Sequence, residues 1–366
     1  MYMAGPRVIV IGAAAHVFPS HMLGLQAIGA NVVGVQDIAL DRLRPVAERF
    51  GCPAFKDVEA LLQTPADLAV IVAPHPFHAE YAVACSQAGL HVLTEKPIAV
   101  EVAEADRMVQ AAEQHGRILA VAFQHRTRGE VQQARKLIQE GAIGEIQRVD
   151  LLATWPRRFG YFKTAPWRGS WRGEGGGILI NQGQHDLDLL CYLAGQPSRV
   201  VGWRRTQLHQ IETEDTISAM VAWPSGATGF IHISTAEVDE TQRIEITGTA
   251  GRLRVTRGQC EWTRNEMDFR EYAATEGNPY AAPPTLPSEL FAGAAGRHVD
   301  VYQDLAEAMA GAHPPIAPGR SGALTLELTN AITHSSIVGG EVSLPLDRDA
   351  YHQTLESLRA GSRASR

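Results

Sequence analysis

Strand-like segments alternate with helical segments over the first third of the chain, and this alternation constrains the fold more than any other feature. Five short apolar runs are separated by stretches with helical spacing, and three of these stretches end at a glycine. Apolar strands separated by amphipathic helices predict a parallel sheet covered on both faces, and a glycine just past a helix is a stop signal. The predicted strands are Arg7–Gly12, Asn31–Gln36, Asp67–Ala73, His91–Thr94 and Ile118–Phe123, and the predicted helices are His21–Ile28, Leu40–Phe50, Phe77–Ala88 and Val102–His115.

The pattern changes after Gln124. A helical stretch, Glu130–Glu140, is followed by longer strand-like runs without helices between them, and Pro224-Ser225-Gly226 separates two of these runs as a hairpin turn. A chain of 366 residues exceeds one ordinary core. We therefore predict an α/β domain over residues 1–124 and an α+β domain with a mostly antiparallel sheet over residues 125–366. The further predicted strands are Ile146–Thr154, Val200–Arg205, Thr216–Trp223, Thr228–Ser234, Arg243–Thr247 and Arg252–Thr256; Asn278–Pro287 is a predicted loop, and helices are predicted at Val299–Met309 and within Gly322–Ile337.

Composition excludes several classes of protein. The net charge of −7 gives no electrostatic case for binding nucleic acid, and no apolar stretch is long enough to span a bilayer. The four cysteines form no CxxC pair and the histidines no HExxH spacing, so neither a disulfide framework nor a metal is predicted. The N-terminus lacks the pattern of a signal peptide. These observations favour a reducing, cytoplasmic location.

The first strand ends at Gly12, where a tight turn can lead into a helix. Backbone amides at such a helix start can face a pyrophosphate. The match to GxGxxG is imperfect, because Ala14 replaces the second glycine and Val17 stands at the third position. Taken alone, the segment is equally compatible with an ordinary strand followed by a glycine turn.

Asp37 ends the second strand, 25 residues after Gly12. An acid at this position can bind both hydroxyls of a ribose. The next residue is Ile38 rather than an arginine that would neutralise a 2′-phosphate, which favours NAD over NADP, although Arg42 and Arg44 follow. The alternative is a strand-end aspartate that caps the next helix.

Lys96 follows the predicted buried strand His91–Thr94. Ligands of open parallel sheets bind beyond the carboxyl ends of the strands, so its amine can reach a cleft there. Pro97 restricts the backbone after Lys96 and can hold it in one geometry. The alternative is an exposed lysine in a loop.

A glycine run, Gly175-Gly176-Gly177, precedes Asn181 and His185. Their separation of four residues can place both on one side of a helix, and the glycines allow the chain to approach a ligand closely. A histidine can accept a hydroxyl proton while hydride leaves the carbon. The alternative is a core histidine beside an apolar stripe of leucines.

Taken together, these segments resemble the glucose–fructose oxidoreductase / inositol dehydrogenase / MocA family over nearly the whole chain. The residues that carry the resemblance are Gly12, Asp37, Pro74-His75-Pro76-Phe77-His78, Glu95-Lys96-Pro97, the glycine run with His185, and Val342-Ser343-Leu344-Pro345-Leu346. The resemblance implies an N-terminal Rossmann domain that binds the dinucleotide. It also implies a C-terminal domain with an open sheet for substrate binding and oligomerisation, commonly as a homodimer or homotetramer.

The family also implies roles for individual residues. Lys96 matches the lysine that binds the reacting oxygen, and His185 the histidine that transfers the proton. Cofactor contacts are implied for Gly12, Ala14, Asp37, Pro74, His78, Glu95, Lys96, Gln124, Trp167 and Arg168, and substrate contacts for Asn181, Tyr161 and Arg172. The sequence departs from the family at Asn181, where an aspartate is usual, and in the glycine turn.

We therefore interpret the chain as an NAD-dependent oxidoreductase acting on a secondary carbinol of a sugar, inositol or sugar derivative. Arginines crowd one region, which is compatible with a uronate or sugar-nucleotide substrate and equally with a solvated loop; they are Arg157, Arg158, Arg168 and Arg172. Two other functions stay open. One is redox-neutral glycoside cleavage through transient oxidation, and the other is a regulator that senses NAD or a sugar without turnover. The sequence does not specify the substrate, the carbon oxidised or the oligomer size.

Overall fold

The computed structural model describes residues 5–361, and the chain divides into two compact units. The first unit contains the chain up to Gln124 together with Arg297–Leu326, and the second contains His125–Gly296 and the chain from Glu327 onward. This division differs from the predicted second domain of 125–366, because Arg297–Leu326 belongs to the first unit. Among the described residues, no helix combines the length and the apolar character needed to cross a membrane.

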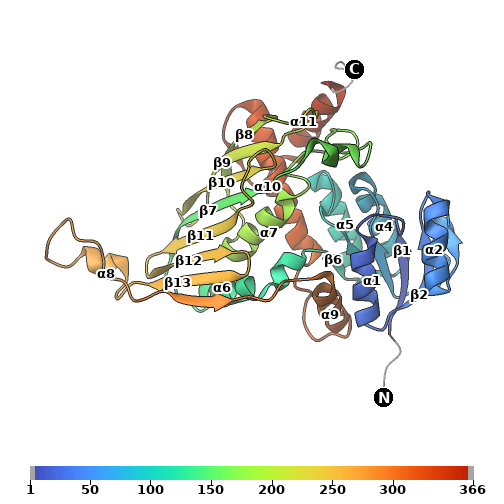
Figure 1. The fold of residues 1–366 in the computed structure, drawn as a ribbon, viewed down its shortest axis with the longest axis horizontal. Helices are drawn as coiled ribbons and strands as arrows, with labels where there is room; N and C mark the ends of the chain where they lie inside the picture. The colour runs from blue at the N-terminus through green and yellow to red at the C-terminus, as the bar shows by residue number, and fades with distance from the viewer. Residues whose placement is uncertain (1–4, 362–366) are drawn as a thin grey trace. The chain divides into compact units, whose positions relative to one another are not determined.

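A parallel sheet of six strands forms the centre of the first unit, in the order β3-β2-β1-β4-β5-β6 (Figure 1). All five predicted strands are present, and the sixth, β3, has only two residues, too few for its pattern to be seen in the sequence. Every residue of β4 is buried, as expected for a strand covered on both faces. The strands are β1 (Arg7–Ile11), β2 (Asn31–Gln36), β3 (Ala54–Phe55), β4 (Leu68–Ile71), β5 (His91–Thr94) and β6 (Leu119–Val121).

The helices of the first unit pack their apolar side chains against this sheet. A core cluster joins strand residues with Phe18 and Leu25 of α1 and with Val301 and Leu305 of α9. This apolar face of α9 is the physical reason why the late segment belongs to the first unit. The helices are α1 (Phe18–Ala27), α2 (Leu40–Phe50), α3 (Val58–Leu61), η1 (His75–Phe77), α4 (His78–Gln87), α5 (Val102–Gln114) and α9 (His298–Met309).

A mixed sheet of nine strands forms the second unit, in the order β14-β13-β12-β11-β7-β10-β9-β8-β15 (Figure 1). Its pairs are antiparallel except for β10 with β7, which confirms the predicted α+β class. The six predicted strands are present. The strands are β7 (Ile146–Thr154), β8 (Arg199–Arg205), β9 (Thr216–Ala222), β10 (Thr228–Ser234), β11 (Gln242–Gly248), β12 (Gly251–Thr256), β13 (Gln259–Arg264), β14 (Glu289–Ala292) and β15 (Val342–Ser343).

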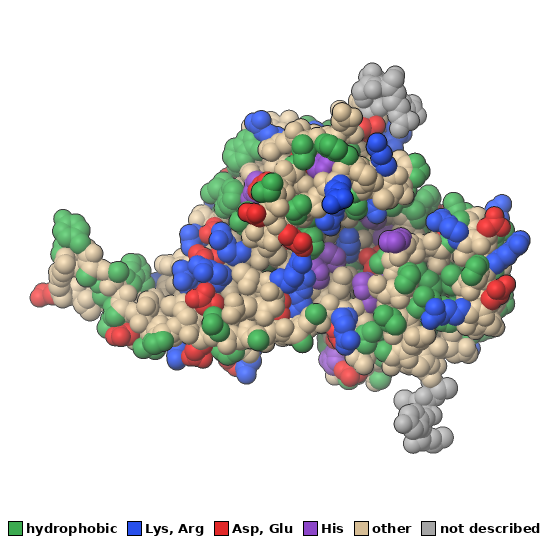
Figure 2. All heavy atoms as spheres, viewed as in Figure 1, with side chains coloured by type: hydrophobic (Ala, Val, Ile, Leu, Met, Phe, Trp, Pro, Cys, Tyr) green, Lys and Arg blue, Asp and Glu red, His purple; other side chains and the backbone are tan. Residues whose placement is uncertain are grey.

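Helices α6 and α7 pack on one face of this nine-stranded sheet. The other face exposes Trp203, Met220 and Phe230, which are 54%, 49% and 40% accessible. An arm that carries α8 extends from the far end of the sheet, and hydrophobic side chains gather at its tip (Figures 1 and 2). The remaining helices are η2 (Gln124–Thr127), α6 (Gly129–Gln139), η3 (Phe159–Lys163), α7 (Gly183–Ala194), α8 (Phe269–Ala273), α10 (Gly319–Val338) and α11 (Arg348–Gly361).

Candidate active site

Three of the predicted site residues follow the ends of parallel strands in the first unit. Gly12 follows β1, Asp37 follows β2, and Lys96 lies two residues beyond β5. Because parallel strands end at the same edge of a sheet, these residues share the edge at which open α/β sheets bind ligands. Pro74 lies beyond β4 at this edge and is exposed.

The chain turns sharply at Gly12, as the sequence predicted. Its φ of 82° lies in the left-handed region, and a Cβ there would fall 2.6 Å from the backbone nitrogen of Ala73. The positive φ and the close approach of Ala73 each require glycine at this position. The amides of Gly12 and Ala13 donate to the carbonyl of Gln36 at 2.8 and 3.0 Å. The turn is therefore fixed between the ends of β2 and β4.

Asp37 accepts two backbone hydrogen bonds. The amide of Ala14 donates to Oδ2 at 3.0 Å, and the amide of Ala39 donates to Oδ1 at 2.8 Å. Ala39 immediately precedes α2, so the alternative role of Asp37 at the start of the next helix is also present. The carboxylate thus ties the glycine turn to the end of β2, beside the exposed Ile38. This position suits ribose hydroxyls. The helix expected directly after the glycine turn begins only at Phe18, and the amides of Gly12, Ala13, Ala14 and Ala15 already donate hydrogen bonds within the protein.

The backbone on both sides of Lys96 is held by buried groups. The Lys96 amide donates to Oε2 of Glu95 at 3.1 Å. His78 is fully buried, and its ring nitrogens lie 2.8 Å from the Pro97 carbonyl and 2.7 Å from the Ala73 carbonyl. Burial lowers the pKa of His78. The imidazole of His78 therefore braces two strand ends, and its implied contact with the cofactor stays a prediction.

In the second unit, His185 lies in the first turn of α7 and is buried. Its ring stacks on that of His125 with centroids 4.2 Å apart, and His125 stacks in turn on Trp155 at 6.4 Å. Asn181 precedes α7, which begins at Gly183. The expectation that Asn181 and His185 share one side of a helix is therefore wrong, because the helix begins two residues too late.

The glycine run before α7 packs against Glu214. A Cβ on Gly177 would fall 1.9 Å from the Glu214 carbonyl oxygen. Oε1 of Glu214 accepts the amides of Gly177 and Leu179 at 2.9 and 3.2 Å, and the Glu214 carbonyl accepts the amide of Ile178 at 3.0 Å. The close approach that the glycines allow is thus to a neighbouring strand connection. Burial raises the pKa of Glu214.

Tyr161 gathers the polar side chains of this region. Its hydroxyl oxygen lies 2.5 Å from Nη1 of Arg168, 3.2 Å from Nδ2 of Asn181 and 2.7 Å from Nε2 of Gln182. Glu174 pairs with Arg168 at 3.8 Å and accepts a hydrogen bond from Asn181. Burial raises the pKa of Tyr161. Tyr161 thus contacts both the second predicted substrate residue, Asn181, and the predicted cofactor residue Arg168.

A pocket of about 560 Å³ lies beside Tyr161 in the second unit. It presents the cations Lys163 and Arg168, the acidic residue Glu212 and the aromatic rings of Phe159 and Phe162, and Arg168 also pairs with Glu174. One wall is His209. A pocket with this lining can accept an anionic group together with an apolar or planar one.

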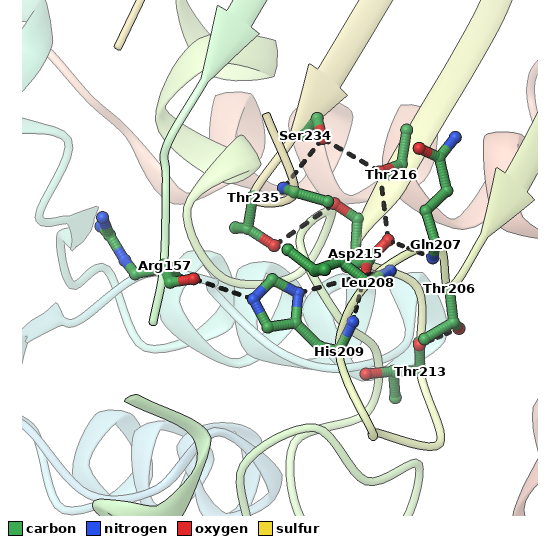
Figure 3. Close-up of polar contacts among 11 residues, drawn as sticks. Arg157, Thr206, Gln207, Leu208, His209, Thr213, Asp215, Thr216, Ser234 and Thr235 are labelled. Carbon is green, nitrogen blue, oxygen red and sulfur yellow. Dashed lines mark hydrogen bonds and ion pairs between the residues drawn. The ribbon is translucent and has the colours of Figure 1, made fainter. Parts of the chain in front are cut away.

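Asp215 forms hydrogen bonds, drawn in Figure 3, with the segment that carries His209, one of the residues that line this pocket. Its carboxylate accepts the amides of Gln207, Leu208 and His209 at 2.8 to 2.9 Å, and the His209 ring lies 3.1 Å away. The other His209 nitrogen lies 2.9 Å from the Arg157 carbonyl. Burial raises the pKa of Asp215, but these hydrogen bonds outweigh it and lower the pKa. Asp215 thereby fixes the start of the loop that carries Tyr161.

The other predicted site residues take less constrained positions. Gln124 begins η2 and is half-buried, Trp167 is half-buried with the Arg168 guanidinium 4.6 Å from its ring centroid, and Arg172 is exposed. Sequence reasoning missed Glu174, Glu214 and Asp215. The run Glu212-Thr213-Glu214-Asp215 directly before a strand was the available indication, because acidic residues that precede a buried strand need partners.

A six-stranded parallel sheet with a glycine turn after β1 and a carboxylate after β2 defines the class as a Rossmann-type dinucleotide-binding protein. Residues 6–123 match the oxidoreductase family with an NAD-binding Rossmann fold, and residues 131–254 match the GFO/IDH/MocA C-terminal domain. The chain belongs to the GFO/IDH/MocA family of oxidoreductases. The predicted family, enzyme class and cofactor NAD are confirmed.

Relatives of stated activity align with different parts of the chain. Myo-inositol 2-dehydrogenase from Thermotoga maritima is 28% identical over 61% of this chain and 67% of its own length. A putative UDP-kanosamine synthase oxidoreductase subunit from Amycolatopsis mediterranei is 32% identical over 55% of this chain, and the alignment spans 61% of that protein. D-apiose dehydrogenase from Paraburkholderia graminis is 26% identical over 86% of this chain and 84% of its own length.

Solved structures resemble the chain over nearly its full length. The WlbA dehydrogenase from Bordetella pertussis, in complex with NADH and UDP-GlcNAcA, has a TM-score of 0.82 at 28% identity and covers 95% of this chain and 100% of its own. The WlbA dehydrogenase from Chromobacterium violaceum, with the same two ligands, has a TM-score of 0.81 at 28% identity over 95% of this chain and 98% of its own.

Proposed function

We propose that this protein transfers a hydride between NAD and a secondary carbinol of a sugar, inositol or sugar derivative. The observation that carries the proposal is the shared edge of the parallel sheet, at which the Gly12 turn, Asp37 and Lys96 follow β1, β2 and β5. A dinucleotide-binding turn and a braced lysine at one sheet edge are what a hydride transfer to a polarised oxygen needs. The named activities of the relatives support this reaction type.

Bound NAD supplies the hydride acceptor at its nicotinamide ring. Lys96 donates a hydrogen bond to the reacting oxygen and stabilises the negative charge that develops on it. His185 accepts the hydroxyl proton, directly or through Lys96. Tyr161, Asn181 and Arg172 orient the substrate. Asn181 cannot supply the negative charge of the aspartate usual in the family, so its part is to position rather than to tune His185.

We propose that the substrate carries an anionic group, which the cations of the second unit would bind. Arg168 lies 4.4 Å from the Tyr161 ring centroid, Arg157 lies 5.3 Å from it, and Lys163 and Arg168 line the adjacent pocket. Cations beside a pocket favour a carboxylate or phosphate. The WlbA complexes contain UDP-GlcNAcA, which carries both groups. We therefore rank uronates and nucleotide-linked sugars above neutral polyols.

Absorbance at 340 nm with NAD or NADP tests the proposed reaction against inositols, aldoses, uronates, glycosides and sugar nucleotides. A rise with NAD that depends on one substrate class supports a dehydrogenase. Glycoside cleavage without net NADH formation, detected by mass spectrometry, would instead support the redox-neutral reaction. Binding without any product would support the sensor.

Two substitutions test the assigned roles. Lys96→Ala should lower kcat by about 10² to 10⁴ while NAD still binds. His185→Ala should remove the limb of the rate profile that arises from proton transfer to the histidine. Near-normal turnover of Lys96→Ala, or an unchanged profile of His185→Ala, contradicts the respective role.

We further propose that the protein forms a homodimer or homotetramer through the exposed face of the nine-stranded sheet. Met220 and Phe230 are cross-strand partners, and Trp203 lies on the neighbouring strand β8. A contiguous apolar patch of this kind marks an association surface. Phe230→Glu should lower the molar mass measured by light scattering.

The four free cysteines support the expected reducing, cytoplasmic location.

A further inference from the structure

A buried cluster in the first unit joins one carboxylate to two histidines and a tyrosine. Oε1 of Glu95 lies 2.9 Å from Nε2 of His21 and 3.2 Å from Nε2 of His298. The other His21 nitrogen lies 2.9 Å from the Tyr302 hydroxyl. The three elements involved are α1, the end of β5 and α9. The cluster therefore links the helix after the cofactor turn to a helix from the distant end of the chain.

The protonation states of the cluster follow from burial and hydrogen bonding. Burial raises the pKa of Glu95, but the hydrogen bonds from His21 and His298 outweigh it and leave the pKa well below its usual range. Burial lowers the pKa of His21 and raises that of Tyr302 well above its usual value. The consistent assignment is an ionised Glu95 that accepts from two histidine N–H groups, with the Tyr302 hydroxyl donating to His21.

The second oxygen of this carboxylate is hydrogen-bonded to the residue that we assign to catalysis. Oε2 of Glu95 accepts the Lys96 amide at 3.1 Å, so Glu95 is hydrogen-bonded through one oxygen to two helices and through the other to the lysine backbone. A carboxylate bound on both oxygens has little rotational freedom. The orientation of the Lys96 backbone then depends on both histidines.

We infer that the His21–Glu95–His298 clamp, meaning these three side chains and their mutual hydrogen bonds, positions Lys96 for the reaction. The three residues are positioning residues, because they act through the backbone of Lys96. The inference rests on the proposed function, in which Lys96 contacts the reacting oxygen. The clamp assigns a role in the site to His298, and hence to α9. His298 was not among the site residues predicted from the sequence.

Kinetics of His298 variants test the clamp. His298→Ala should lower kcat about ten-fold, because displacing a reactive group by a fraction of an ångström has a cost of this order, while KM for NAD stays within about two-fold. His298→Gln retains an N–H donor at similar reach and should recover most of kcat. The matched control is His313→Ala, since His313 is an exposed histidine just beyond α9 that pairs with Glu307.

The pH dependence separates positioning from simple loss of stability. The titratable groups that face Glu95 are His21, His298, Tyr302, His78 and Lys96. Without the His298 donor the pKa of Glu95 rises, so protonation of Glu95 begins at a higher pH. In a His185→Ala background, where His185 no longer sets the acid limb, the residual kcat should therefore fall at a higher pH when His298→Ala is added but not when His313→Ala is added. An unmoved limb with unchanged kcat overturns the clamp.

A second measurement is independent of turnover. The chain contains only four lysines, Lys56, Lys96, Lys136 and Lys163, so ¹³C-methylation gives a spectrum in which Lys96→Arg identifies the Lys96 signal. That signal should shift in His298→Ala and in Glu95→Gln, and remain in place in His313→Ala. If no substrate turns over, the proposed function fails, while this spectrum still decides whether the clamp acts on Lys96. An unmoved Lys96 signal rejects the clamp.

Metal analysis completes the test, because two histidines and a carboxylate are also a ligand set for zinc. The ligand atoms of His21, Glu95 and His298 lie within 4.8 Å of one another. The clamp predicts that extensive chelation leaves kcat unchanged. A stoichiometric divalent metal that is lost in His298→Ala, with activity that returns only on adding zinc, would replace the clamp by a metal site.

Discussion

Gly177→Ala tests whether the glycine run is set by packing against Glu214. A Cβ at this position would lie 1.9 Å from the Glu214 carbonyl oxygen, and real Cβ atoms do not approach closer than 3.0 Å. The two backbones must therefore separate by about 1.1 Å. That movement disrupts three hydrogen bonds, from the amides of Gly177 and Leu179 to Oε1 and from the amide of Ile178 to the carbonyl.

The expected loss of stability in Gly177→Ala follows from these contacts. Overpacking a buried site costs about 1 to 3 kcal/mol, and the value should lie near the upper end because the clash is with backbone. A loss of about 3 kcal/mol lowers the melting temperature by roughly 6 to 12 °C for a unit of this size. The turn that moves also carries Asn181 and leads into α7 with His185. A displacement of about 1 Å should lower kcat by about 10².

Gly176→Ala is the matched control, one residue away in the same run. A Cβ there meets the Ile180 side chain at 3.2 Å, which a small shift relieves. The reduced entropy of the unfolded chain offsets this cost by about 0.4 to 1 kcal/mol. Thermal unfolding followed by circular dichroism should therefore show a large fall for Gly177→Ala and little change for Gly176→Ala. Equal melting temperatures would refute the packing explanation.

Three other predictions follow from the structure. Asp37→Ala should weaken NAD more than NADP, as measured by titration calorimetry, and equal weakening would remove Asp37 from ribose recognition. Asp188→Asn should cost about 3 to 5 kcal/mol in urea unfolding, because Asp188 binds the buried Arg126 at 2.6 and 2.9 Å; a change below about 1 kcal/mol would contradict this. Burial raises the pKa of Asp186 from 3.8 to about 6, so its stabilising contribution is present below pH 4 and about 3 kcal/mol is lost as the pH rises through 6. Asp186→Asn should remove that slope from the unfolding free energy, and an unchanged slope would assign it elsewhere.

The local pattern of apolar and polar residues was sufficient to predict most of the strands. The strands β7 and β10 have the predicted bounds, because their segments are rich in β-branched and apolar residues, a pattern that is visible without tertiary context. The short strands β3 and β15 were missed, since two residues carry no periodicity. The strand β13 was missed because its side chains are mostly half-buried and polar.

The residues of the candidate site could be predicted only where their position at the end of a strand indicates a role in ligand binding. Gly12, Asp37 and Lys96 were found because strand ends in a parallel sheet converge at one edge. The Tyr161 cluster was found in part, since its partner Glu174 lies in a loop with no periodic pattern. His298 was not found, because nothing in the sequence shows that α9 returns to the first unit beside Glu95.

The sequence by itself determined the order of strands and helices, the class of each sheet, the glycine turn and the family, since these depend on neighbouring residues and on motif spacing. Tertiary structure alone decided that Arg297–Leu326 joins the first unit and that the glycine run packs on Glu214. It also decided that His21 and His298 both bind one carboxylate oxygen of Glu95. These features depend on contacts between residues far apart in the chain. Such contacts arise from the burial of complementary apolar faces, which residue spacing does not reveal.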